Sequence, residues 1–177
     1  MDDAGEPQAP WPDDEFVDYA QARQHTLLRA AYLVTGDLRI AEQVVRTALV
    51  RLGRQWARVR EEQPDLFVRR LVYRDAVASW RGRPPETLPA GPAWDEPDQP
   101  WDADLVERRR EVLRALDALT PRQRAVVVLR WFEERGEGDV AQVLGCSVAD
   151  AHAEGVEALG RLRDALPRAD IGTGGLR

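Results

Sequence analysis

The stretch from Leu119 to Arg163 carries start and stop signals for three helices joined by two tight turns, and it constrains the fold more than any other part of the chain. Thr120 is placed to cap the first helix, Pro121 suits its first turn, and Gln123 completes a capping box with Thr120. An apolar run predicts a wide buried face for this helix. Its members are Val126, Val127, Val128, Leu129, Trp131 and Phe132.

The two turns follow from the residues that come next. Gly136 is expected to end the first helix, and a short second helix is predicted over residues 138–144. Gly145 can adopt the left-handed conformation that terminates it. Ser147, with Asp150 three residues later, is placed to cap the third helix. Helical spacing predicts one buried side for this helix, made of Ala151, Gly155, Ala158, Leu159 and Leu162.

The spacing Ala141-x-x-x-Gly145 places a small residue where two helices approach and a glycine at the sharp turn between them. This pattern is typical of a helix-turn-helix unit, whose last helix is offered to the major groove of DNA. Capped short helices with a turn glycine also occur in ordinary helical bundles, so this alternative stays open at this point.

The N-terminal half has the periodicity of three further helices, over residues 16–34, 38–59 and 64–80, and no alternating pattern of a strand. We therefore predict a three-helix bundle. The residues expected to point inward are Phe16, Tyr19, Ala20, Leu27, Ala31, Tyr32, Ile40, Val44, Ala48, Leu52, Trp56, Phe67, Leu71 and Val72.

Arginines gather with aromatic residues in the third of these helices. They are Arg69, Arg70, Arg74, Arg81 and Arg83, beside Tyr73 and Trp80. Arginine pairs with phosphate and aromatic rings stack on unpaired bases, so the cluster suits single-stranded or melted nucleic acid. A solvated basic face with aromatics in the core explains it equally well. Because Arg69 and Arg70 are adjacent, a helix points them in different directions, which leaves a structural role open for at least one.

Residues 84–104 change composition: they are proline-rich and hold six acidic residues and no basic one. We predict a flexible acidic linker there. It separates two helical domains, at residues 13–83 and 105–166, which we expect to fold separately. The chain ends, residues 1–12 and 167–177, are expected to be disordered. The predicted fold class is all-α, with two helical bundles joined by this linker.

Several classes of function find no support in the sequence. Cys146 is the single cysteine, and His25 and His152 lie far apart, so we expect no metal site, cofactor or disulfide within the chain. No paired inward carboxylates, activated nucleophile or phosphate-binding glycine loop indicates an enzyme. No apolar run is long enough to span a membrane, and we expect no signal peptide.

Stretches in both halves resemble one family. The first half has LLRAAYLVTGD, AEQVVRTALVRL with Trp56, and FVRRLVYRDAVASW; the second has ALTPRQRAVVVLRWFEE and VAQVLGCS. Together they are similar to bacterial sigma-70-type transcription initiation factors, and within these to the SigE-like extracytoplasmic-function group. The resemblance covers Phe16 to Arg83 and Leu105 to Arg163.

The resemblance implies a cytoplasmic factor with two partners, core RNA polymerase and promoter DNA, and a possible third, an anti-sigma or other regulatory protein. It places polymerase binding on Glu42, Gln43 and Arg46. It places the melted promoter strand on Arg69, Arg70, Arg74, Trp80 and Arg81. The recognition helix for duplex DNA carries Ser147, Asp150, His152, Glu154, Glu157 and Arg161.

The chain departs from the family pattern at contact positions. Glu42 is retained, but Gln43, Arg46 and Thr47 stand where acidic and glutamine residues are usual, and Arg74 stands in place of a common asparagine. In the last helix His152, Glu154 and Glu157 replace lysine, glutamine and arginine. We therefore carry two hypotheses: a sigma-like initiation factor, or a degenerate sigma that acts as a protein-interaction regulator without reading promoters.

Overall fold

The structure, a computed structural model, describes residues 14–81, 111–112 and 114–165 of the 177-residue chain. These parts are helical and contain no strand, so the predicted all-α class is confirmed. None of the described helices is long and apolar enough to cross a lipid bilayer. The predicted linker, residues 84–104, and the two predicted tails lie outside the described residues.

The N-terminal unit is a bundle of three long helices and one short one. They are α1 (Asp14–Thr35), α2 (Leu38–Gly53), α3 (Trp56–Val59) and α4 (Pro64–Ala78). Asp37 caps α2 by accepting a hydrogen bond from the Ile40 N–H, and Pro64 occupies the first turn of α4, where its missing N–H costs nothing.

The prediction of one continuous helix over residues 38–59 is wrong, because the helix stops at Gly53 and restarts at Trp56. Glycine weakens a helix interior, and the break lets the chain turn there. The turn brings the Trp56 ring into the core, with its centroid 5.5 Å from that of Phe16 and 5.1 Å from that of Tyr19. Burial of this ring against two others therefore outweighs continuation of the helix.

The C-terminal unit follows helical residues 111–112 and 114–117. It consists of α6 (Pro121–Val127), a five-residue π-helix η1 (Val128–Phe132), α7 (Glu137–Leu144) and α8 (Val148–Ala165). The caps predicted at Thr120, Gly145 and Ser147 are confirmed here, but the first helix ends at Phe132 and not at Gly136, which is the N-cap of α7. Thr120 and Gln123 form a capping box, Gly145 adopts φ 64°, and Ser147 and Asp150 cap each other's backbone at the start of α8.

Three residues expected in the core are exposed, with 39% to 47% of their surface accessible: Trp131, Phe132 and Leu159. The cause for the first two is the π-helix, in which the Glu133 N–H donates to the Val128 carbonyl five residues back. The wider turn rotates the side chains that follow out of the α-helical face. Leu159 lies one residue past Ala158, which is about 100° around the helix from the buried side.

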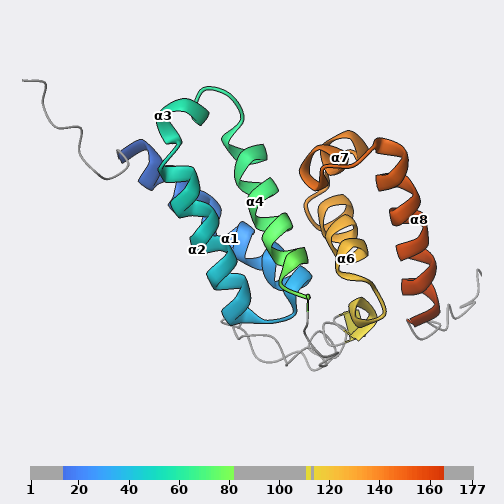
Figure 1. Cartoon of the computed structure of the whole chain (residues 1–177). Coiled ribbons are helices and arrows are strands. Elements are labelled where there is room, and N and C mark those ends of the chain that lie inside the picture. The colour runs from blue at the N-terminus through green and yellow to red at the C-terminus, as the bar shows by residue number, and fades with distance from the viewer. Residues whose placement is uncertain (1–13, 82–110, 113, 166–177) are drawn as a thin grey trace, which may run out of the picture.

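The two units lie against each other (Figure 1). Helix α4 contacts α7 and α6, and α1 contacts α6 and η1. Helix α8 lies on the side of α6 and α7 that faces away from α4. Separate folding of the two bundles stays a prediction, but their surfaces are joined in this arrangement.

We expect Gly145→Ala to lower the free energy of unfolding by about 1 kcal/mol, because a side chain disfavours the left-handed conformation at φ 64°. Urea denaturation measures this change. The control is Gly138→Ala inside α7, where an added Cβ meets no heavy atom within 4 Å and alanine favours the helix. Equal losses in both variants would contradict the prediction.

Candidate nucleic-acid interface

Arg69 does not face solvent but lies buried between the two units. Its Nε donates to Oε2 of Glu133 at 2.5 Å, and its Nη1 lies 3.5 Å from Oδ2 of Asp65. The hydroxyl of Tyr73 donates to the other oxygen of Glu133 at 2.6 Å. Both Glu133 oxygens are therefore bound by α4, across 60 or more residues of sequence.

Burial and charge act in opposite directions on this cluster. Burial disfavours the charged guanidinium, but the hydrogen bond and charge of Glu133, followed by the charge of Asp65, raise the pKa of Arg69 above its usual value. Burial and then Glu133 raise the pKa of Tyr73 well above that of a free tyrosine. Arg69 therefore stays charged, and Tyr73 stays a hydrogen-bond donor.

Two more members of the predicted cluster contact the C-terminal unit or the core. Arg70 Nε donates to the carbonyl of Gln142 in the last turn of α7 at 2.8 Å. The Trp80 indole donates to the carbonyl of Val34 at 3.0 Å, and the guanidinium of Arg124 lies 4.7 Å from the centroid of its ring. Arg124 is itself buried in α6, with Asp117 2.6 Å away.

Arg74 and Arg81 are exposed. Arg74 lies next to Asp75, with which it forms an ion pair at 2.8 Å, yet 60% of its side chain remains accessible. Arg83 lies outside the described residues. In the predicted melted-strand cluster, Arg74, Arg81 and part of the Arg70 side chain are therefore exposed. Arg69 and Trp80 instead lie against the C-terminal unit.

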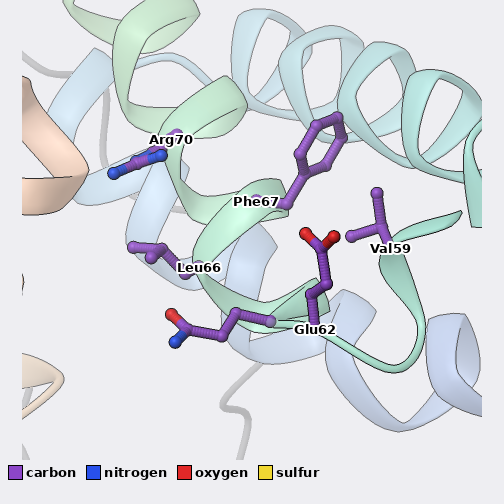
Figure 2. A pocket seen from close by; sticks show the side chains of 6 residues that line it. Val59, Glu62, Leu66, Phe67 and Arg70 are labelled. Carbon is purple, nitrogen blue, oxygen red and sulfur yellow. The ribbon is translucent and has the colours of Figure 1, made fainter.

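A surface pocket of about 260 Å³ lies beside this cluster, where α3 leads into α4 (Figure 2). Its lining residues are Val59, Glu62, Gln63, Leu66, Phe67 and Arg70. The Phe67 ring and the Glu62 carboxylate lie close together, and Arg70 lies at the other end. The sequence analysis placed Phe67 in the core and did not predict that Glu62 and Gln63 line a pocket. The one local sign of this pocket in the sequence was the run of polar residues just before Pro64.

The predicted polymerase-binding residues lie on the outer face of α2. Glu42, Gln43 and Arg46 are exposed, whereas Val44 and Val45 between them are buried. Val50, one turn after Arg46, is half exposed and extends this face with an apolar side chain. The face therefore offers mixed polar and apolar contacts to a protein surface.

The predicted recognition residues lie on α8, which packs on α6 and α7 in a helix-turn-helix arrangement. Several of them contact neighbouring side chains. His152 Nδ1 lies 2.9 Å from the carboxylate of Glu137, Glu154 pairs with Arg122 at 3.4 Å, and Glu157 accepts from Arg161 at 2.7 Å. Among the described residues, no cluster of histidine, cysteine and carboxylate side chains could hold a metal ion.

Hydrogen bonds keep two exposed carboxylates of this unit ionised. The side-chain and backbone hydrogen bonds of Ser147 lower the pKa of Asp150, and the hydrogen bond with His152 lowers that of Glu137. Asp150, at the start of α8, therefore carries a negative charge at neutral pH.

Comparison with known proteins agrees with this arrangement. Residues 109–162 match the family described as Sigma-70, region 4. The chain is 32% identical over 163 residues to the RNA polymerase sigma-E factor of Streptomyces coelicolor, and the match covers 89% of each chain. The chain belongs to the extracytoplasmic-function group of the sigma-70 family.

Two further similarities extend over most of this sigma-family chain. It is 25% identical over 183 residues to the ECF RNA polymerase sigma factor SigG of Mycobacterium tuberculosis, covering 88% of this chain and 50% of SigG. Its fold resembles that of the sigma factor RpoE from Bartonella quintana, solved in complex with the anti-sigma factor NepR. The TM-score is 0.60 at 18% identity, with 86% of this chain and 97% of the other covered.

Asp65 holds the start of α4 to α1 and also pairs with Arg69. It accepts hydrogen bonds from the Tyr19 hydroxyl at 2.7 Å and from Arg23 Nε at 3.2 Å. Burial alone raises the pKa of Asp65, but Tyr19, Arg69 and Arg23 together lower it below its usual value.

A lowered pKa in the folded state means that the Asp65 carboxylate stabilises the fold above its ordinary pKa, and that this contribution is lost as the pH falls through the folded-state value. We expect Asp65→Asn to be less stable than the unmodified protein at pH 7, and to lose less stability between about pH 5 and pH 3. Urea denaturation across this range measures both effects. Asp18→Asn, at an exposed position of α1, is the control; identical pH profiles for the two variants would contradict the prediction.

Proposed function

We propose that this chain is a transcription initiation factor that acts in the cytoplasm by binding core RNA polymerase and promoter DNA, and not by catalysis. The observation that carries the proposal is the similarity to an RNA polymerase sigma factor, with 32% identity over 89% of both chains. Both helical units fall within that similarity. This favours initiation over the alternative of a degenerate regulator that binds proteins alone.

The first unit is the part we propose for the melted strand. Arg70 and Arg74 on α4, and Arg81 in the turn that follows it, offer exposed cations for phosphates. The pocket beside them combines an aromatic ring, Phe67, with the polar ends of Glu62 and Gln63. An unpaired base needs these elements: a ring to stack on and hydrogen-bonding groups for its edge.

We propose the outer face of α2 as the polymerase-binding surface. Glu42, Gln43 and Arg46 project from one side of a helix whose other side is fixed in the core. A helix held in this way presents its side chains without further ordering, which lowers the entropic cost of association. Val50 adds apolar area that association would bury.

We propose that α8 reads duplex DNA weakly or in an altered way. Asp150, Glu154 and Glu157 bring carboxylates to the helix that a family member would set against phosphates. Non-specific affinity for DNA comes from cations that neutralise phosphates, so this edge opposes it. A third proposed partner is an anti-sigma or other regulatory protein, since the structural neighbour was solved with one.

A reciprocal pair of variants tests the two surfaces of the first unit. Arg74→Ala should weaken binding to a promoter-derived single strand several-fold and reduce the salt dependence, with the slope of log K against log salt falling by about 0.7 for one lost phosphate contact. Its association with core polymerase should be unchanged. Arg46→Ala should weaken co-purification with core polymerase and leave strand binding unchanged. If Arg74→Ala alters neither affinity nor slope, this arginine belongs to a solvated face.

The reading positions of α8 can be tested by a gain of function. We expect the triple variant His152→Lys, Glu154→Gln and Glu157→Arg to bind some sequences of a duplex promoter library more tightly than others, because it restores cations and an amide to the exposed helix. Binding is measured on the full chain. Asp18→Arg with Glu61→Arg adds the same charge to the first unit and should raise affinity without selectivity. Nanomolar, sequence-selective duplex binding by the unmodified chain would show that α8 already reads a promoter.

A further inference from the structure

His152, in the second turn of α8, is held at one of its two ring nitrogens by a side chain of α7. Its Nδ1 lies 2.9 Å from Oε1 of Glu137, which stands in the first turn of α7 beside α8 (Figure 1). The ring is nevertheless open to solvent, since 62% of the His152 side chain is accessible. Among the described residues, none hydrogen-bonds the second ring nitrogen, Nε2. One nitrogen is therefore bound, and the other is available to a ligand.

A second charge lies behind the carboxylate that holds the ring. Arg130 of η1 has its Nη2 3.8 Å from the same oxygen of Glu137, and its Nη1 donates to the carbonyl of Arg135 at 2.8 Å. The hydrogen bond with His152, aided by the charges of His152 and Arg130, lowers the pKa of Glu137 below its usual value. Glu137 therefore stays ionised at neutral and mildly acidic pH, and an ionised carboxylate can only accept hydrogen bonds.

An acceptor beside Nδ1 decides which nitrogen of a neutral ring carries the proton. Since Glu137 can only accept, the hydrogen bond requires the proton on Nδ1, and Nε2 is then left with a lone pair. Without such a partner, a neutral imidazole can carry its proton on either nitrogen. Glu137 thus makes the outward nitrogen of a neutral His152 an acceptor. When the ring is protonated, both nitrogens donate, and Nε2 becomes a donor.

The other side chains of α8 bring no further charge to this ring. Val148 and Val156 stand one turn before and one turn after His152, with 51% and 59% of their surface accessible. Asp150 and Glu154 are each two residues away, which places them about 200° around the helix. The surface of α8 that adjoins the ring is therefore apolar, and the polar group that it presents is Nε2.

In the major groove, the bases differ in which edge atoms donate and which accept. Cytosine and adenine present amino donors, whereas guanine presents the acceptors N7 and O6. We infer that His152 determines base specificity in α8 and that Glu137 is its positioning residue. Glu137 fixes Nε2 of the neutral ring as an acceptor, which selects cytosine or adenine on the contacted strand, and protonation of the ring favours guanine instead. The inference rests on the proposed reading of duplex DNA by α8.

The proton position is tested first, without DNA, by nuclear magnetic resonance of the ring nitrogens in the isotope-labelled full chain. The sequence has two histidines, so a His25→Gln variant assigns the signals of His152. At about pH 8 we expect the proton on Nδ1, and we expect Glu137→Ala to lose this preference. Asp139→Ala removes the same charge from the same turn of α7, at an exposed position, and should leave the proton on Nδ1.

Base preference is then measured with the full chain and a library of short duplexes at about 50 mM salt, where weak binding to phosphates can be detected. At this salt and neutral His152, we expect the unmodified chain to prefer cytosine or adenine at one position by about fivefold, as for one hydrogen bond. His152→Ala and Glu137→Ala should lose this preference, and Asp139→Ala should keep it. At about pH 5.5, the preference of the unmodified chain should move to guanine. The circular dichroism of each variant is checked first.

An unchanged proton position in folded Glu137→Ala would overturn the inference. So would an unchanged base preference in Glu137→Ala or His152→Ala, or a preference that stays the same at about pH 5.5. In these cases selective duplex binding by the unmodified chain leaves the proposed function in place. If the unmodified chain carries the Nδ1 proton and co-purifies with core polymerase but shows no base preference, α8 does not read duplex DNA, and the inference fails with that part of the proposed function.

Discussion

The carboxylate of Glu133 is the most deeply bound of the polar groups that link the two helical units. It is almost completely buried and both of its oxygens are bound by α4, one by Arg69 and the other by Tyr73. A buried charge is tolerated only where its partners are fixed in good geometry. Asp65, held by Tyr19 and Arg23 of α1, pairs with a second nitrogen of Arg69. Together with the Arg70 contact to the Gln142 carbonyl, Glu133 therefore helps to fix the register of α4 against the C-terminal unit.

The position of Glu133 depends in turn on an irregular stretch of backbone. The π-helix ends at Phe132, Glu133 has φ −96° and ψ 0°, and Glu134 adopts φ 55°, the one non-glycine residue with positive φ among the described residues. Such a conformation costs about 1 kcal/mol or more and persists only where the surroundings stabilise it. The loop is fixed by the Arg135 N–H donating to Leu129 and by Arg130 donating to the Arg135 carbonyl. The strain lies next to the residue that the interface uses.

Most of the fold could be predicted from sequence because its signals are local. Thr120 and Gln123 cap α6 whatever surrounds them, and Gly145 can turn left-handed on its own. The failures came where tertiary contacts decide. The helix predicted over residues 38–59 is interrupted just before Trp56, whose ring packs against two other rings. The π-helix turns Trp131 and Phe132 outward. Neither effect can be predicted from the spacing of apolar residues in the sequence.

The site was less predictable for the same reason. Arg69 and Arg70 are identical in type and adjacent, yet one is buried and the other is exposed. They differ because Arg69 pairs with Glu133, 64 residues away, and no local sequence pattern predicts that ion pair. The exposed face of α2 was easier to place, because Val44 and Val45 fix which side of the helix enters the core. The spacing of apolar residues thus predicts which side of a helix faces outward, but it does not predict which other part of the chain packs on that side.

Two of the polar side chains on α8 form ion pairs with other helices. Its contacts run inward to the C-terminal unit itself: His152 to Glu137 on α7 and Glu154 to Arg122 on α6. Exposed ion pairs contribute little stability each, so the stability of the unit does not explain them well. They do occupy side chains at positions of α8 that we propose for reading DNA. These pairs therefore bind α8 to its own unit, whereas the contact between the two halves is made by Glu133, which binds Arg69 and Tyr73 of α4.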